Sequence, residues 1–147
     1  MKLRFAKFVR QMRLAGRHAG LLVHSFVLLA AVRIALYTTT YHRIAKYVRV
    51  DNHGPEGRRP VYLIVWAVEH ASRIVPRANC LTRALVLQYL LGRNGHGSII
   101  RVGVAQSDVA VFEAHAWVLY EGGVIMGGTA EEISRYTPIV DLAADIR

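Results

Sequence analysis

Cysteine is almost absent from this sequence, and its scarcity restricts the chemistry open to the protein. The 147 residues contain one Cys, Cys80, and seven His. A single Cys excludes an internal disulfide framework and every zinc or iron–sulfur site that needs several thiolates. No two histidines have a metal-ligand spacing such as H-x-x-x-H, so we expect neither a metal nor a cofactor. Cys80 is therefore either an inert core residue or a nucleophile.

Long polar stretches, internal repeats and low-complexity tracts are also missing. Apolar residues make up 53% of the chain and charged residues 20%, and the mean hydropathy is +0.25. This composition excludes an intrinsically disordered chain, whose mark is low hydrophobicity. The length corresponds to about one domain of ~100–200 residues. We therefore treat residues 1–147 as one domain.

Acidic residues are absent from the first 50 positions, which hold ten of the 19 Lys and Arg residues. The other nine basic residues and all ten acidic residues follow, so the net charge of +9 belongs to the front of the chain. We distinguish a basic, apolar helical part (1–50), with a docking or packing role, from a core over 60–147. Such an asymmetry is typical of segments that contact nucleic acid or an anionic membrane, although solvated basic helix faces are commoner.

No hydrophobic run in the sequence is long enough to predict a membrane span. The main apolar stretch, Leu21 to Val32, contains His24 and Ser25, is followed by Arg33, and is shorter than the ~20 residues that a span needs. No cleavage site of the A-x-A kind ends it cleanly, which argues against a signal peptide. We expect a buried or interfacial helix in a cytoplasmic protein, with contact to a membrane surface as one use of the basic residues.

Hydrophobic periodicity predicts helices first and strands later, the order of an α+β domain. The loop at 51–60 has two Gly and two Pro in ten residues, and after the Gly-rich segment 92–97 the pattern changes to the alternation of strands. The first expected helix is basic and amphipathic, begins near residue 3 and ends near 16–20. The other expected helices are 21–37, 61–72, about 80–91 and 131–136, with a short turn at 41–50. The expected strands form an antiparallel meander, 99–105, 113–120 and 124–126, followed by an extended piece at 139–142.

The expected helix start at Cys80 and the expected strand around His115 together suit nucleophilic catalysis. The positive end of a helix stabilises a thiolate, and Arg77 and Arg83 flank Cys80 with further positive charge. A Cys nucleophile needs a base, which His115 supplies in this interpretation. On these residues alone an inert core Cys is the commoner case, because one Cys among seven His often has a His downstream.

Two linked motifs favour a nucleophilic Cys80 over an inert one. The runs C-L-T-R-A-L at 80–85 and A-H-A-W-V at 114–118, with V-G-V at 102–104 between them, resemble the transglutaminase-like leader peptidases known as the B protein of lasso peptide biosynthesis. The similarity covers roughly residues 60–128, and the pair of motifs at this spacing is far more specific than either one alone. The lack of a longer N-terminal extension resembles the split form, in which a separate small protein recognises the leader.

The resemblance implies a transglutaminase- or papain-like core, in which one helix carries Cys80 and a small antiparallel sheet carries His115. It also implies that Cys80 attacks the carbonyl at the leader–core junction, while His115 takes the thiol proton and later protonates the leaving amine. After hydrolysis of the thioester the core has a free amino terminus. The implied partners are the precursor peptide, the leader-recognition protein and the lasso cyclase, with no nucleic acid.

The sequence departs from the family pattern at the third catalytic position. Family members often carry an acid about 12 residues after the His, where this chain has Gly127, and often a Glu after A-H-A-W-V, where it has Leu119. A hairpin turn at 121–122 sets His115 opposite Gly128, so an orienting acid belongs at this place. We take Glu121, the nearest acid, as the candidate third member, although it lies at the turn.

Other groups stay open for this role and for the oxyanion hole. Asp108, Glu131 and Asp141 are acids that folding can bring near, and an Asn, a backbone carbonyl or water also orients an imidazole. The backbone N–H of Cys80 is the natural oxyanion donor. Asn79 is a weaker second donor, since its more usual role is a helix cap.

Two functions of other kinds also stay open. A non-catalytic module that binds a membrane surface or nucleic acid fits the charge of residues 1–50, although no aromatic side chains alternate with the basic ones as stacking platforms. Acyl transfer on the same fold requires an amine that outcompetes water at the thioester.

Overall fold

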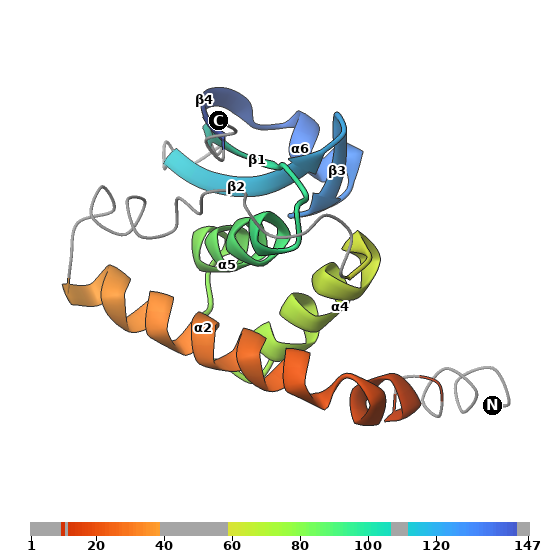
Figure 1. Ribbon diagram of the computed structural model, residues 1–147. Helices are drawn as coiled ribbons and strands as arrows, with labels where there is room; N and C mark the ends of the chain where they lie inside the picture. The colour runs from red at the N-terminus through yellow and green to blue at the C-terminus, as the bar shows by residue number, and fades with distance from the viewer. Residues whose placement is uncertain (1–9, 11, 39–58, 107–111, 144–147) are drawn as a thin grey trace, which may run out of the picture.

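A computed structural model of the chain describes residues 10, 12–38, 59–106 and 112–143. The elements run in the order α2 (Ala19–Thr38), α4 (Val61–Ser72), α5 (Cys80–Arg93), β1 (Ile99–Gln106), β2 (Phe112–Tyr120), β3 (Gly123–Met126), α6 (Ala130–Ser134) and β4 (Thr137–Ala143). Figure 1 shows α2, α4 and α5 below a small sheet, with α6 beside it. This confirms the predicted α+β class.

The structure describes only part of the N-terminal segments expected from the sequence. Residue 10 and residues 12–17 are helical and residue 18 is a turn, so the first expected helix ends within the expected stretch, 16–20. The first part of this helix, the turn at 41–50 and most of the loop at 51–60 lie outside the described residues.

The three long helices enclose an apolar core that follows from their periodicity. In α5, Ala84, Leu87 and Leu91 recur at helical spacing and are fully buried. They pack with Ile64 of α4 and Leu29 of α2 in one cluster. Contacts between all three pairs of these helices hold them together as a layer, and this layer fixes where α5 begins.

The sheet has the order β3-β2-β1-β4, and every neighbouring pair is antiparallel. The first three strands form the predicted meander. The extended piece expected at 139–142 is longer, and it pairs along the free edge of β1, with Val140 opposite Val102. Pro138 lies in this edge strand, where a residue without an N–H is tolerated.

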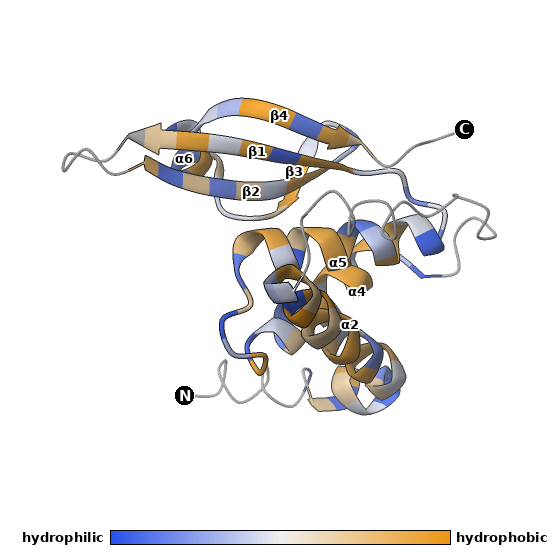
Figure 2. Cartoon of the chain, turned by 90° about the vertical axis from the view of Figure 1, so that its left-hand side faces the viewer, coloured by the Kyte–Doolittle hydropathy of each residue, from blue (hydrophilic) through white to orange (hydrophobic). Residues whose placement is uncertain are grey.

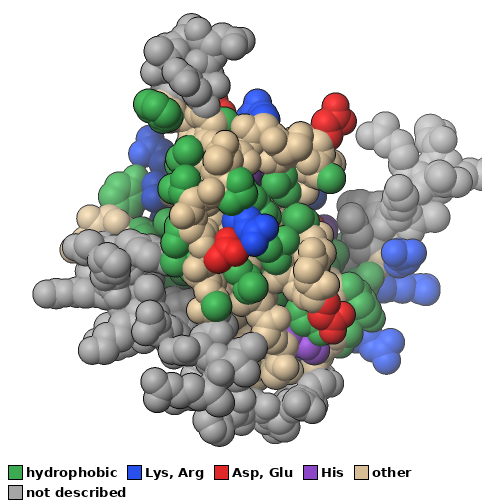
Figure 3. Space-filling model, turned by 90° about the horizontal axis from the view of Figure 1, so that it is seen from above, with side chains coloured by type: hydrophobic (Ala, Val, Ile, Leu, Met, Phe, Trp, Pro, Cys, Tyr) green, Lys and Arg blue, Asp and Glu red, His purple; other side chains and the backbone are tan. Residues whose placement is uncertain are grey.

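One face of the sheet rests on α5, as Figure 2 shows. Ile100, Ala116 and Val118 from this face are buried in the same cluster as the helices. Figure 3, which looks down on the sheet, shows hydrophobic side chains around a few charged ones. Arg101 and Asp141, cross-strand partners in β1 and β4, form a bidentate ion pair with N–O distances of 2.7 and 2.6 Å.

The short helix α6 is shifted from the expected 131–136. Thr129 is its N-cap, and a capping box joins the Thr129 hydroxyl to the backbone of Glu132 and the Glu132 carboxylate to the backbone N–H of Thr129. This cap starts the helix at Ala130, and the helix ends at Ser134. Tyr136 therefore lies after the helix.

Helix α2 is longer than the apolar stretch in the sequence, because helical structure continues past Arg33 to Thr38. The expectation that this segment is too short to span a membrane is corrected. By length and composition it is long enough, as some core helices and signal sequences also are. Only 17% of its most apolar window is buried inside the structure. Leu29 faces the core, whereas Val23 and Ile34 are exposed.

Candidate active site

Cys80 is the first residue of α5, and the residue before it fixes that start. The side-chain oxygen of Asn79 accepts hydrogen bonds from the backbone N–H of Thr82 at 2.8 Å and from the Thr82 hydroxyl at 2.7 Å. Asn79 is thus an N-cap. The predicted helix start at Cys80 is confirmed, and the oxygen of the Asn79 side chain is used in the cap.

The first turn of α5 offers backbone donors beside the sulfur. The first N–H groups of a helix have no partner within the helix, and Asn79 satisfies only that of Thr82. The first turn carries no acidic residue that would oppose a negative charge. Cys80 is half-buried against the core, so packing holds the thiol at this positive helix end.

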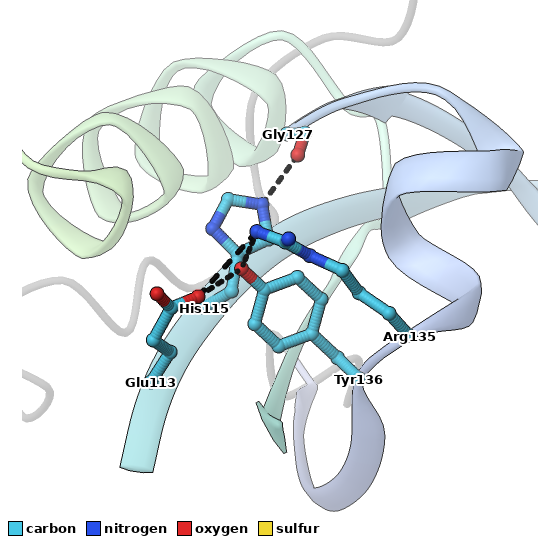
Figure 4. A network of polar contacts seen from close by, with 5 residues as sticks. All are labelled: Glu113, His115, Gly127, Arg135 and Tyr136. Carbon is cyan, nitrogen blue, oxygen red and sulfur yellow. Dashed lines mark hydrogen bonds and ion pairs between the residues drawn. The ribbon is translucent and has the colours of Figure 1, made fainter. Parts of the chain in front are cut away.

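His115 is held in β2 by contacts on several sides. Its Nε2 is hydrogen-bonded to the backbone carbonyl of Gly127 (Figure 4). Because a carbonyl only accepts, Nε2 carries the proton and Nδ1 is the basic nitrogen. The centroid of the imidazole lies 5.0 Å from that of the Tyr136 ring and 6.0 Å from that of the Trp117 ring system. The tautomer and the orientation of the imidazole are therefore both fixed.

Position 127 has no room for a side chain. Gly127 has a φ of 118°, a conformation that L side chains rarely adopt. A Cβ atom there would lie 2.4 Å from the Cβ of Trp117 and 2.7 Å from its Cα. The group that the structure sets against Nε2 of His115 is therefore the backbone carbonyl of Gly127 and not an acidic side chain at this position.

A β-bulge explains how Gly127 comes to lie against Trp117. The pairing of β2 with β3 shifts by one residue between Val118 and Leu119. Beyond the bulge Val118 pairs with Met126, so the chain that follows runs alongside Trp117. The expectation that His115 lies directly opposite position 128 is wrong, because it requires a regular hairpin without a bulge.

Cys80 and His115 line the same cavity, which has a volume of about 340 Å³. Its walls come from α4, the first turn of α5, the middle of β2 and the segment from the end of β3 through α6. The structure thus brings together two residues that are 35 positions apart in the sequence. The charged or hydroxyl-bearing side chains that also line it are Glu69, Arg83, Glu132, Arg135 and Tyr136.

The two arginines of this cavity differ in their partners. Arg135 donates to the hydroxyl of Tyr136 at 2.9 Å and makes an ion pair with Glu113 at 3.4 Å (Figure 4). The Nε of Arg83 is buried and has no hydrogen-bond partner among the described residues. Arg83 therefore lines the cavity as a cation whose buried Nε is unsatisfied.

Glu132 brings a negative charge that α6 stabilises. The pKa of Glu132 lies below its ordinary value, mainly because its carboxylate accepts a hydrogen bond from the backbone N–H of Thr129. The hydrogen bond with the Thr129 side chain lowers this pKa as well. Electrostatic interactions with Arg135 and His115 lower this pKa further. Glu132 is thus an ionised carboxylate close enough to His115 to interact with it electrostatically.

The acids considered from the sequence lie elsewhere. Glu121 is exposed at the β2–β3 turn, with a left-handed φ of 49°, and does not line the cavity. Asp141 is paired with Arg101, and Glu131 is exposed on α6. Asp108 lies outside the described residues. The geometry therefore gives Glu121 no place beside the imidazole.

The two basic neighbours of Cys80 in the sequence, Arg77 and Arg83, differ in their positions relative to the cavity. Arg77 is exposed, and its φ of 58° is in the left-handed region, which is uncommon for a residue other than Gly. Strained backbone of this kind gathers at functional sites, where the surroundings hold it. Arg83 reaches the cavity, whereas Arg77 does not line it.

Sequence reasoning missed most of the cavity wall. Glu69 and Tyr136 carry no motif, because only the packing of α4 and the chain after α6 brings them to His115. The adjacent glycines 127 and 128 were the available signal, since both have positive φ. No group of three or more His, Cys, Asp or Glu side chains suited to a metal occurs within the described parts of the chain.

Comparison with protein families assigns the chain to a superfamily. The profile of the Transglutaminase-like superfamily matches residues 26–141, well over half of the chain. The chain belongs to the transglutaminase-like superfamily. Comparison with curated proteins and comparison with solved structures gave no match. This superfamily includes cysteine peptidases and acyltransferases and commonly consists of cysteine-dependent enzymes. Its matched region contains both Cys80 and His115.

Proposed function

We propose that this transglutaminase-like chain is a cysteine peptidase that removes the leader from a lasso peptide precursor. The observation that carries the proposal is the shared cavity, which Cys80 lines from a helix N-terminus and His115 lines with its Nε2 already hydrogen-bonded. The superfamily supplies the reaction class. The linked motifs C-L-T-R-A-L and A-H-A-W-V narrow it to the lasso peptide leader peptidases.

In the proposed reaction, Nδ1 of His115 accepts the proton of the Cys80 thiol, and the thiolate attacks the carbonyl at the leader–core junction. The tetrahedral oxyanion is stabilised by backbone N–H groups at the start of α5. The imidazolium then protonates the leaving amine, which frees the core peptide. Water hydrolyses the remaining leader thioester and restores Cys80.

The Gly127 carbonyl performs the part of the orienting acid. It keeps the proton on Nε2 of His115, so that Nδ1 stays available as the base. In a serine protease, replacing the acid by a group that permits the wrong tautomer lowers kcat ~10⁴-fold. Here the tautomer is correct, but a neutral carbonyl stabilises an imidazolium less than a carboxylate does. The proposal therefore gives an active enzyme that is slower than one with a complete Cys-His-Asp triad.

The proposed partners are a separate leader-recognition protein and the lasso cyclase, in the cytoplasm. The surface suited to docking is the helical N-terminal part, where Arg13 and Arg17 are exposed and α2 exposes Val23 and Ile34. Charge reversal at Arg10, Arg13 and Arg17, all of them exposed, is expected to weaken association with the recognition protein. Cleavage of a saturating precursor should persist, because these residues lie far from the cavity in the sequence and do not line it. Unchanged association would remove this role.

The direct test is the intact mass of a candidate precursor peptide incubated with this chain and the recognition protein. The expected result is a single cut, lost in both Cys80→Ala and His115→Ala while circular dichroism shows that the variants fold. Cleavage at the wild-type rate by either variant would contradict the proposal. If no cut occurs with a folded protein and a bound recognition partner, the hypothesis of a non-catalytic module with a basic N-terminal part gains support.

Acyl transfer is separated from hydrolysis in the same assay. Adding a primary amine such as glycine ethyl ester gives a leader–amine adduct only if the amine outcompetes water at the thioester. We expect the leader with a free carboxyl group as the main product. A predominant amine adduct would instead assign the chain to the acyltransferases of its superfamily.

A further inference from the structure

A second cavity lies next to Cys80, and its character differs from the first. It has a volume of about 390 Å³ and is again lined by both Cys80 and His115. Its other walls are aliphatic: Leu81 from α5 and, among others, Val102 and Val140 from the sheet. Among the described residues, no Asp, Glu, Lys or Arg side chain lines it.

The two cavities therefore present opposite chemistry to a peptide bound at Cys80. The first contains four charged side chains, among them Arg83 with its unsatisfied Nε and the ionised Glu132. The second offers aliphatic walls. An extended peptide advances about 3.3 Å per residue. When a scissile carbonyl lies at Cys80, a side chain that enters the aliphatic cavity therefore belongs to a residue within two positions of the bond.

We propose that this aliphatic cavity is a specificity subsite that binds a branched aliphatic or aromatic side chain of the peptide substrate, within two residues of the scissile bond. The inference rests on the proposed peptidase function and adds a substrate preference to it. The cavity is continuous with the catalytic pair, because Cys80 and His115 form part of its wall. A polar or charged side chain would lose its hydration there and find no hydrogen-bond partner in the aliphatic walls.

The size and the lining of the cavity define the expected discrimination. Ligand pockets of ~300–1,000 Å³ hold groups far larger than a methyl, so a Leu or Phe side chain fits a space of about 390 Å³. Each methylene that an apolar pocket gains or loses changes kcat/KM by ~10–200-fold. Replacing the recognised residue by Ala should therefore lower kcat/KM by at least ~10-fold, and replacing it by Asp should lower it more.

Strand β4 offers a matched pair of variants. Val140 lines the cavity and is 43% exposed, so a substitution there leaves the buried core intact. Its neighbour Ile139 is 61% exposed and does not line the cavity. Val140→Asp places a carboxylate at the rim of the proposed subsite. Ile139→Asp makes the same chemical change on the same strand without touching it.

The experiment is cleavage-site profiling with the full chain and a library of peptides of diverse sequence, read by mass spectrometry. The expected result is an enrichment of about 10-fold or more for Leu, Ile, Val or Phe over Ser and Asp at one position within two residues of the cut. Val140→Asp should abolish this enrichment, and Ile139→Asp should retain it. Thermal denaturation of both variants confirms that they are equally folded.

The outcomes separate the subsite from the function on which it rests. Cuts that need Cys80 but show no apolar preference on either side overturn the subsite alone. An apolar preference that survives in Val140→Asp does the same. No cuts, or cuts that persist in Cys80→Ala, overturn the peptidase function, and the subsite falls with it.

Discussion

The replacement of an orienting acid by the Gly127 carbonyl makes a sharp prediction about position 127. If the chain had merely lost an acid, Gly127→Asp would restore a Cys-His-Asp triad and raise activity. The structure predicts the opposite. With a φ of 118°, any Cβ at position 127 would approach Trp117 to 2.4 Å, so the backbone must move. The carbonyl that is bound to His115 then moves with it.

The magnitude follows from two separate costs. A residue other than Gly at strongly positive φ costs about 1–3 kcal/mol. Overpacking against a buried side chain adds about 1–3 kcal/mol, and Trp117 is only 2% exposed. Gly127→Ala should therefore lower the free energy of unfolding by about 2–6 kcal/mol. At about 2–4 °C per kcal/mol for a chain of this size, the Tm falls by about 10 °C.

Gly122 provides the matched control. It has a φ of 80° in the β2–β3 turn, and a Cβ there meets no atom within 4 Å. Gly122→Ala carries the backbone cost without the steric one, so the difference between the two variants isolates the contact with Trp117. Thermal denaturation measures both, and precursor cleavage shows whether Gly127→Asp gains activity. A Gly127→Asp protein as stable as Gly122→Asp and faster than the wild type would refute the reasoning.

Three further predictions concern the elements that hold the site. Asn79→Ala removes both hydrogen bonds of the α5 cap and should lower stability by about 1–2 kcal/mol in thermal denaturation; an unchanged Tm would contradict the cap. The lowered pKa of Glu132 means that its carboxylate stabilises the fold above the ordinary value of 4.5, and that this contribution is lost as the pH falls through the lowered pKa. Urea unfolding of Glu132→Gln should therefore show a smaller loss of stability below pH 4.5 than the wild type, and parallel pH profiles would count against it. Leu29→Ala empties a fully buried position where α2 meets the core and should cost about 2–5 kcal/mol, whereas a cost below 1 kcal/mol would show that α2 is not packed as described.

The parts of the fold that sequence could predict depend on local signals. The helix at 61–72 follows a Pro that has extended backbone, and its bounds agree with those expected. The start of α5 could be predicted from Asn79, because its side chain bonds to the first turn of its own helix and needs no distant partner. After α5 the spacing of apolar residues changes from helical to alternating. This change likewise predicted the strands, since alternation is a property of neighbouring residues.

The remaining features depend on contacts between distant segments. Nothing local to 137–143 indicates that this strand pairs with β1, because its partner lies some 40 positions earlier. The bulge between Val118 and Leu119 displaced the expected register by one residue. The orienting group was harder still to foresee, because it belongs to the backbone of Gly127, and its local signal is only the pair of adjacent glycines at 127 and 128. Sequence singled out Cys80 and His115, which line one cavity in the structure, whereas Glu121, its candidate for the third group, lies at the turn.

The central claim is that Cys80 and His115 act together as nucleophile and base. The most direct measurement is the acid-quenched intact mass of the protein during cleavage of a precursor peptide. Because the chain has one Cys, a leader thioester appears as a single mass increment that can belong to only one thiol. The account predicts this increment in the wild type, its absence in Cys80→Ala, and its formation at least ~10²-fold more slowly in His115→Ala. Cleavage of the precursor by Cys80→Ala at the wild-type rate, without the mass increment, would contradict the account. Formation of the thioester in His115→Ala as fast as in the wild type would contradict it as well.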